Sequence, residues 1–280
     1  MDVQAALSRM YGNWTDGRMS HLVDAPGCSQ RPDCGMQHAP ARSFIIWFSQ
    51  RTGSTLLTSG LAATGVAGKP GEWLNQGDPA ELTPAALQAI WQEGTTSNGV
   101  FGLKYGPSRD TFLAWTGAFR RVLELPDDLP VPQVWAATFP NCRHVFMTRR
   151  NKVRLAASWW RAIQSGEWHR LHGEAPLPVD LEAAYLFGAI DHLFAEASLR
   201  EASIGEFFVE AGVIPLTLVY EDFIGEYAGT VHRVLDFLNL DSQGVTLPPP
   251  TYDRLADALT ERWVERFRQE RQAGWANPAW

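Results

Sequence analysis

A short polar turn with the composition of an anion-binding loop follows an apolar run near residue 50. Its side chains are one cation followed by small residues: Arg51, Thr52, Gly53, Ser54 and Thr55. Glycine and small hydroxyl residues let backbone N–H groups approach a ligand, and the start of a following helix adds a partial positive charge. The turn is predicted to bind a phosphate-like group. A capped strand-to-helix turn without a ligand is the alternative interpretation.

The flanking residues indicate the elements that position this turn. Residues 44–48 are all apolar and predict a buried strand, and residues 56–64 predict a helix. The nucleoside triphosphate signature G-x-x-x-x-G-K-[ST] is not present, because the turn lacks the first glycine and the lysine. If strand, turn and helix bind a phosphate-like group, the site is of a different kind from the nucleoside triphosphate loop.

A second group of cations follows a later predicted strand at residues 144–148. The helix expected over 149–163 begins with Arg149, Arg150, Lys152 and Arg154. Cations at a helix N-terminus oppose the helix dipole, so a bound anion would relieve the conflict. Arg150 and Ser158 are about two helical turns apart and could share one phosphate. The alternative is a solvated basic helix start.

Both segments resemble the donor site of sulfotransferases that use 3′-phosphoadenosine-5′-phosphosulfate (PAPS). The turn is similar to their 5′-phosphosulfate loop, and the Arg150 and Ser158 pair is similar to their 3′-phosphate motif. Other stretches extend the likeness: residues 65–75, 100–105, 149–153 and 161–169. The chain resembles the bacterial trehalose 2-sulfotransferase-like family, specifically over 43–170 and more loosely beyond.

Length and composition favour one α/β domain with a full core, since the chain has 280 residues, of which 45% are hydrophobic and 20% charged. Further strands are predicted at 100–104 and 215–220, and a helical stretch at 181–204. We expect a three-layer, P-loop-like domain with a central, mainly parallel sheet of four to five strands flanked by helices. This domain spans 1–280, with an irregular N-terminal arm at 1–42 before the core at 43–280.

Charge and cysteine content restrict the partners and the compartment. The net charge of −7 argues against a nucleic-acid partner, and no run approaches the roughly 18 apolar residues of a transmembrane segment. Three cysteines are too few for a disulfide scaffold, which fits a reducing, cytoplasmic location. Cys28, Cys34 and His38 match no zinc spacing and lack a fourth ligand, so no metal is expected.

The resemblance implies a reaction and its main residues. The sulfuryl group of PAPS would pass to a hydroxyl of a small acceptor, a carbohydrate or glycoconjugate, by in-line displacement that releases PAP. Arg51 and the turn would neutralise the leaving phosphate, and Lys104 would reach the sulfonate oxygens. Many sulfotransferases have a catalytic histidine after the second strand, but Tyr105 follows Lys104 here. The resemblance therefore points to Glu72 as general base, with His169 as the next candidate.

The resemblance also suggests binding residues outside the two donor segments. Arg266 and Arg268 of the last helix would lie near the nucleotide. Trp73, Trp168 and His169 would face the acceptor, since flat rings stack on sugars. Glu221 and Asp222 are assigned a structural role, and a homodimer is left open.

Two other classes of function compete with sulfuryl transfer. A nucleotide-dependent small-molecule kinase would need a Walker lysine and a magnesium carboxylate, and Arg51 stands where that lysine is expected. A non-catalytic PAP- or PAPS-binding protein would use the same donor contacts without transfer. The acceptor itself is not determined, because the loops that would contact it are the least diagnostic part of the sequence.

Overall fold

The computed structural model describes residues 39–253, 255 and 257–280, so most of the predicted N-terminal arm, with Cys28, Cys34 and His38, lies outside the described residues. Within the described part, four parallel strands form one sheet in the order β2-β1-β3-β4. Their bounds are β1 (Arg42–Phe48), β2 (Val100–Tyr105), β3 (Arg143–Thr148) and β4 (Leu216–Val219). The predicted parallel sheet of an α/β fold is confirmed.

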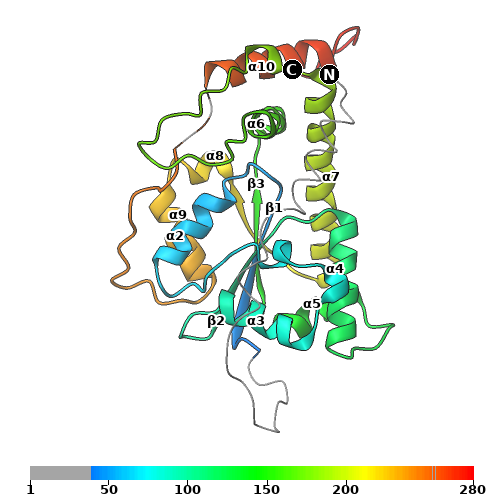
Figure 1. Ribbon diagram of the computed structural model, residues 1–280, viewed down its shortest axis with the longest axis vertical. Helices are drawn as coiled ribbons and strands as arrows, with labels where there is room; N and C mark the ends of the chain where they lie inside the picture. Colours follow the sequence, from blue (N-terminus) through cyan, green and yellow to red (C-terminus); the bar gives the residue numbers. More distant parts are fainter. Residues whose placement is uncertain (1–38, 254, 256) are drawn as a thin grey trace.

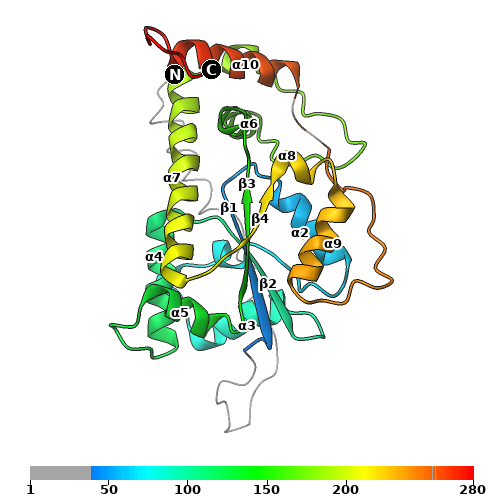
Figure 2. The same cartoon turned by 180° about the vertical axis from the view of Figure 1, so that it is seen from behind.

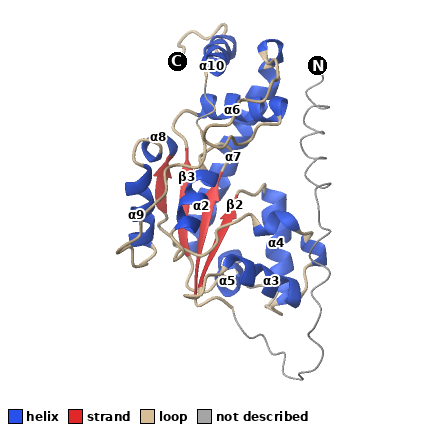
Figure 3. Cartoon of the chain, turned by 60° about the vertical axis from the view of Figure 1, so that its left-hand side comes forward, coloured by secondary structure: helices blue, strands red, loops and turns tan. Residues whose placement is uncertain are grey.

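The alternating side chains of β1 divide the core between the two faces of the sheet. Phe44 and Ile46 face one apolar cluster, and Ile45 and Trp47 face the other. The first cluster is covered by α2 (Ser54–Ala63) and α9 (Tyr227–Phe237). The second is covered by helices that lie across the sheet from these two (Figures 1 and 3): α3 (Pro84–Gly94), α4 (Arg109–Val122), α5 (Val131–Thr138) and part of α7 (Phe187–Ala211). These are the three layers expected from the sequence.

The parallel register brings the carboxyl ends of the strands to one edge. Phe48 is the register partner of Met147, and Trp47 is the partner of Tyr105. Residues that follow β1, β2 and β3 therefore meet at this edge, which we call the carboxyl edge. Beyond it lie α6 (Lys152–Ser165) and α10 (Ala258–Arg271), and α7 runs along the side of the molecule toward them (Figures 1 and 2).

Local sequence signals account for several helix boundaries. Thr83 followed by Pro84 is typical of a helix start, and Thr83 caps α3 because its Oγ1 accepts a hydrogen bond from the N–H of Ala86. The helix expected over 149–163 begins later, at Lys152, because the side chain of Asn151 caps it by accepting from the N–H of Arg154. Short elements complete the chain: η1 (Trp73–Gln76), η2 (Pro79–Glu81), η3 (Glu182–Ala184) and α8 (Tyr220–Phe223).

A third apolar cluster joins α6, α7 and α10. Trp159 and Trp160 of α6 are fully buried in it. The helical stretch predicted over 181–204 consists of η3 and the longer helix α7.

His144 on β3 is buried against the rings of Trp47, Phe207 and Phe208, on the face of the sheet that α7 covers. Only 7% of it is exposed, and its Nδ1 accepts a hydrogen bond from Nε1 of Trp47 at 2.9 Å. Burial lowers the pKa of His144 to about 4, so the ring is neutral in the folded protein at pH 7. In the unfolded chain the same ring has its ordinary pKa near 6.5.

The fold is therefore expected to lose stability in mild acid. Below pH 6.5 His144 becomes protonated in the unfolded chain, whereas in the folded protein it stays neutral until the pH falls to about 4. This difference should lower the free energy of unfolding by about 2 kcal/mol between pH 7.5 and pH 5. Urea titrations of the wild type and of His144→Gln, which keeps an acceptor for Trp47, measure it. A pH dependence that His144→Gln leaves unchanged would contradict this assignment.

Candidate active site

The turn after β1 has the backbone geometry of an anion-binding loop. Arg51 (φ 66°) and Gly53 (φ 80°) adopt the left-handed conformation, and Thr52 Oγ1 donates to the carbonyl oxygen of Ser49 at 2.8 Å. A Cβ atom at Gly53 would lie 2.9 Å from the ring of Tyr220, so this position has no room for a side chain. Gly53 is also the N-cap of α2 and supplies no side-chain cap. The first N–H groups of α2 are thus available to an anion.

The side chain of Arg51 reaches from the turn to α6. Its Nε donates to Ser158 Oγ at 3.1 Å, and its Nη1 donates to the carbonyl oxygen of Trp168 at 2.5 Å. Burial, with the nearby cation Arg149, lowers the pKa of Arg51 to about 10. The guanidinium therefore remains charged at neutral pH, and Arg51 precedes Ser54, the first residue of α2, by three positions.

Lys104 and Glu72 meet next to this turn. The Nζ of Lys104 lies 2.6 Å from Glu72 Oε1 and donates to Thr55 Oγ1 at 2.8 Å. The Lys104 side chain is 8% exposed, and its ammonium lies 4.9 Å from the centre of the Phe48 ring. Because the N–H of Lys104 also bonds to the carbonyl oxygen of Gly71 at 2.8 Å, the loop that precedes η1 is fixed against β2.

This loop brings Glu72 to the end of β2, where its carboxylate meets Lys104. A second hydrogen bond, from Asn75 Nδ2 to Glu72 Oε2 at 2.5 Å, orients the carboxylate. Its side chain is 32% exposed, so one side of it faces solvent, where an acceptor could approach. Glu72, Lys104 and Thr55 form a contiguous polar group at the carboxyl edge.

His169 joins the same group from the segment after α6. Its Nε2 lies 3.4 Å from Thr55 Oγ1, and its ring centre lies 5.3 Å from that of Tyr252. Burial, together with the charges of Arg51 and Lys104, lowers the pKa of His169 to about 4. The imidazole is therefore neutral at pH 7. Both candidate bases lie close to Lys104 and the turn.

Arg150 and Ser158 are not brought together in this structure. Arg150 makes a two-pronged ion pair with Asp222, at 2.8 and 2.6 Å, and Ser158 accepts from Arg51 instead. The helical spacing argument does not hold because Arg150 precedes the first residue of α6 and so is not on the helical lattice. Both residues still border the carboxyl edge, from the end of β3 and from α6.

The cations at the start of α6 are balanced by carboxylates. Besides Arg150, they form three pairs: Arg149 with Glu221 at 3.6 Å, Lys152 with Glu201 at 2.6 Å, and Arg154 with Glu261 at 2.5 Å. Acidic side chains from other elements therefore offset these charges, so the crowding of cations does not by itself require a bound anion. Glu221 accepts from the N–H of Arg150 and Asp222 from its guanidinium, contacts that agree with the structural role expected of both acids.

The remaining predicted residues lie in less direct positions. Arg266 on α10 pairs with Glu270 at 2.7 Å and lies over the ring of Tyr185, and none of the hydrogen bonds or ion pairs between described residues joins it or Arg268 to the turn. Trp73 packs against the core, and its Nε1 donates to the carbonyl oxygen of Gly102 at 3.0 Å. Trp168 packs against the α6, α7 and α10 cluster.

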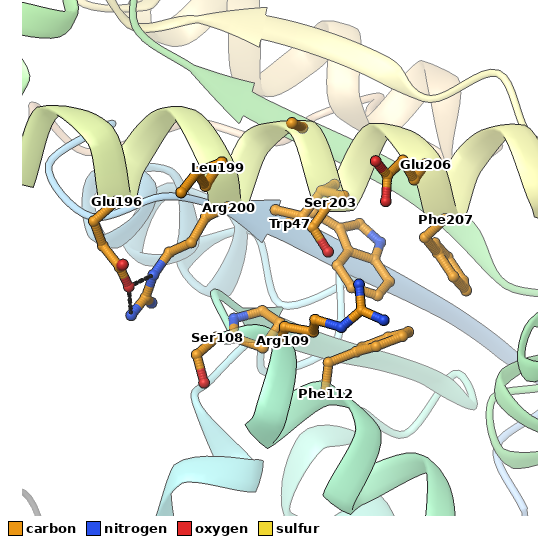
Figure 4. A pocket seen from close by; sticks show the side chains of 13 residues that line it. Trp47, Ser108, Arg109, Phe112, Glu196, Leu199, Arg200, Ser203, Glu206 and Phe207 are labelled. Atoms are coloured by element: carbon orange, nitrogen blue, oxygen red, sulfur yellow. Dashed lines mark hydrogen bonds and ion pairs between the residues drawn. The ribbon is translucent and has the colours of Figure 1, made fainter.

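A pocket of about 370 Å³ lies between α4 and α7 (Figure 4). Trp47, Phe112 and Phe207 form apolar parts of its wall, and Arg109 extends among them in the close-up view. Arg200 on its rim pairs with Glu196 and donates to the carbonyl oxygen of Gly106 at 3.0 Å. The pocket therefore borders the segment that follows Lys104, with both charges and rings in its lining.

Sequence reasoning did not find Glu201, the acid of α7 that contacts the ends of β1 and β3. No local motif marks it, because it lies in the middle of a long helix and its partners are far away along the chain. Within the described part of the chain, no helix is long and apolar enough to cross a membrane, and no group of three potential ligand side chains is arranged to hold a metal ion.

The turn, the parallel sheet and the polar group at its carboxyl edge have the arrangement of an anion-binding site. The Stf0 sulphotransferase family matches residues 43–270, and this chain belongs to that family. It is therefore an enzyme that transfers sulfate. This finding disfavours the two alternative functions, a nucleotide-dependent kinase and a non-catalytic binding protein.

Two relatives match most of the chain. It is 30% identical over 272 residues to the trehalose 2-sulfotransferase of Mycolicibacterium smegmatis, covering 82% of this chain and 96% of the relative. It is 28% identical over 264 residues to the trehalose 2-sulfotransferase of Mycobacterium tuberculosis, covering 82% and 95%. Among solved structures, the sulfotransferase domain of the Synechococcus PCC 7002 olefin synthase has 16% identity and a TM-score of 0.40, covering 86% of this chain and 98% of that one.

Proposed function

We propose that this enzyme transfers the sulfuryl group of PAPS to a hydroxyl of a carbohydrate or glycoconjugate. The observation that carries the proposal is the contact of Lys104 with both Thr55 and Glu72 beside the uncapped N-terminus of α2. This arrangement combines an anion site, a cation and a carboxylate within hydrogen-bond reach. The names of the two relatives support a sugar acceptor.

The reaction would be an in-line displacement at sulfur. The acceptor oxygen attacks sulfur, the bond from sulfur to the 5′-phosphate oxygen breaks, and PAP leaves. Glu72 takes the hydroxyl proton of the acceptor as the new bond forms. Arg51 and the N–H groups at the start of α2 neutralise the leaving phosphate, while Lys104 binds sulfonate oxygens. No step in this sequence needs a metal ion.

Transfer of labelled sulfate provides the direct test. The full chain is incubated with PAPS that carries ³⁵S in its sulfuryl group, together with trehalose, other sugars, or an extract of the native cell. Labelled sugar and an equal amount of PAP are expected, with the label on a hydroxyl oxygen. Turnover with adenosine 5′-phosphosulfate but none with PAPS would contradict the proposed donor, and label only in non-carbohydrate products would contradict the proposed acceptor.

The 3′-phosphate of the donor is assigned to Arg150 and Ser158. In the structure Arg150 binds Asp222, so binding of the donor would require exchange of one anion for another. Both side chains are largely exposed, at 60% and 63%, so water screens this pair and the exchange is feasible. Ser158 already lies beside Arg51 and could contact the nucleotide from α6.

Arg150→Ala is expected to remove the preference for PAP over AMP. PAP should bind the wild type at least about tenfold more tightly than AMP, because each charge-assisted contact to the 3′-phosphate contributes on the order of 1.5–3 kcal/mol. Calorimetry with both nucleotides measures the ratio. Asp222→Asn is the matched control, since it frees Arg150 from its partner and should keep or increase the preference. Equal binding of PAP and AMP to the wild type would contradict the assignment.

Cytoplasmic location and a homodimer remain part of this proposal. The cytoplasmic location is supported by the low cysteine content, which fits a reducing compartment. The homodimer rests on family resemblance alone. Fractionation of the native cell and light scattering of the purified chain test the two expectations separately.

A further inference from the structure

We infer that Glu201 is a positioning residue that fixes the two donor-binding segments relative to each other, an inference that rests on the proposed function. Glu201 belongs to α7, which runs alongside the sheet in Figures 1 and 2. Its Oε1 accepts from Ser49 Oγ at 2.8 Å, and its Oε2 accepts from Thr148 Oγ1 at 2.7 Å. One carboxylate thus binds the ends of two neighbouring strands, β1 and β3.

Lys152 completes this cluster. Its Nζ donates to both carboxylate oxygens of Glu201, at 2.7 and 2.6 Å, and to Thr148 Oγ1 at 2.7 Å. The side chains of Glu201 and Lys152 are 12% and 24% exposed, and Ser49 is fully buried. In such surroundings hydrogen bonds are strengthened and an unpaired charge is strongly unfavourable. The cluster is therefore held as a unit.

The position of the cluster explains what it can control. Ser49 begins the turn and lies two residues before Arg51, whose segment receives the 5′-phosphate in the proposal. Thr148 ends β3 and lies two residues before Arg150, whose segment receives the 3′-phosphate. The ribose limits how far apart the two phosphates of the donor can lie, so the two segments must be held at a matching separation. Glu201 accepts hydrogen bonds from Ser49 and Thr148, the residues from which these two segments start.

Arg200, the residue before Glu201 on α7, also bonds to segments that follow strands of the sheet. Its Nη1 donates to the carbonyl oxygen of Gly106 at 3.0 Å and lies 3.4 Å from Oε1 of Gln50. Gly106 follows β2, and Gln50 precedes Arg51. Successive residues of α7 therefore contact the segments after β1, β2 and β3, which indicates that this helix sets the geometry of the whole carboxyl edge.

Three nucleotides separate a positioning role from a role in stability alone. The folded full chain is titrated by calorimetry with PAP, with adenosine 5′-monophosphate and with adenosine 3′-monophosphate. Glu201→Gln loses one acceptor oxygen and the charge that balances Lys152, so it is expected to weaken binding of all three by about tenfold. Asp191→Asn is the matched control, an acid-to-amide change elsewhere on α7 that removes the pair with Arg271, and it should leave all three affinities unchanged.

Two further variants remove one arm of the cluster at a time. Of the two monophosphates, Ser49→Ala should weaken binding of the 5′-monophosphate alone, and Thr148→Val should weaken binding of the 3′-monophosphate alone, while each variant should also weaken binding of PAP. These two variants test the inference if Glu201→Gln does not fold. Three results would overturn the inference. Folded Glu201→Gln could bind all three nucleotides as the wild type does, it could lose affinity for only one of the two monophosphates, or Asp191→Asn could lose as much affinity as Glu201→Gln. A wild type that binds no PAP would instead refute the proposed function.

Discussion

Replacing Arg51 with alanine is expected to lower kcat by about 10²-fold or more, the scale for loss of a charge-stabilising donor. The reason is that the negative charge on the leaving 5′-phosphate grows as the bond to sulfur breaks, so the guanidinium acts more strongly on the transition state than on bound donor. In the structure Arg51 belongs to the turn that precedes α2, and its guanidinium is anchored by Ser158 and the carbonyl oxygen of Trp168. Steady-state transfer from PAPS and calorimetry with PAP measure the two effects separately.

The matched variant for this experiment is Arg51→Lys, which keeps the charge and places an L-residue at the same left-handed φ of 66°. Lysine lacks the planar fork that can bond to Ser158 and to a phosphate together, so an intermediate kcat is expected. If alanine weakens PAP binding while kcat stays normal, Arg51 only anchors the donor. A similar loss in both variants would show that the geometry of the fork matters more than its charge.

Replacing Glu72 with glutamine is expected to reduce transfer by about 10²–10⁴-fold, the usual contribution of a general base. Affinity for PAP should remain close to that of the wild type, because the base acts only when an acceptor is bound. Glutamine can still accept from Asn75, so the loop before η1 is expected to keep its position.

Glu81→Gln offers a surface control, since Glu81 in η2 is exposed and none of the described hydrogen bonds or ion pairs joins its side chain to the site. It should transfer sulfate at the wild-type rate. Normal turnover by Glu72→Gln would exclude Glu72 as the base and transfer the role to His169, whose neutral ring lies near Thr55. His169→Asn would then be expected to show the large loss.

The sequence was sufficient to predict the local units of this protein. The strand, turn and helix around Arg51 follow from an apolar run, a group of small residues and a second apolar run, and all three depend on neighbours along the chain. The same holds for the cap at Thr83 and for Lys104 near the end of β2. Family resemblance, carried by several such segments, led to the sulfotransferase class, which the comparisons confirm.

Partners of the charged side chains depended on the tertiary structure. Arg150 was expected near Ser158 but binds Asp222, and Ser158 accepts from Arg51 instead. Glu201 was not predicted at all. Each of these contacts joins elements that are far apart in the sequence.

The physical reason is the order of the strands. Local patterns of apolar and polar residues determine where a strand or helix forms, but the order β2-β1-β3-β4 determines which strand ends become neighbours. Only that order brings Ser49 and Thr148 within reach of one acid on α7, and only the packing of α8 against this edge gives Arg150 an acidic partner. The sequence alone thus determined the elements and the class of chemistry, whereas the tertiary structure decided which charges neutralise each other around the site.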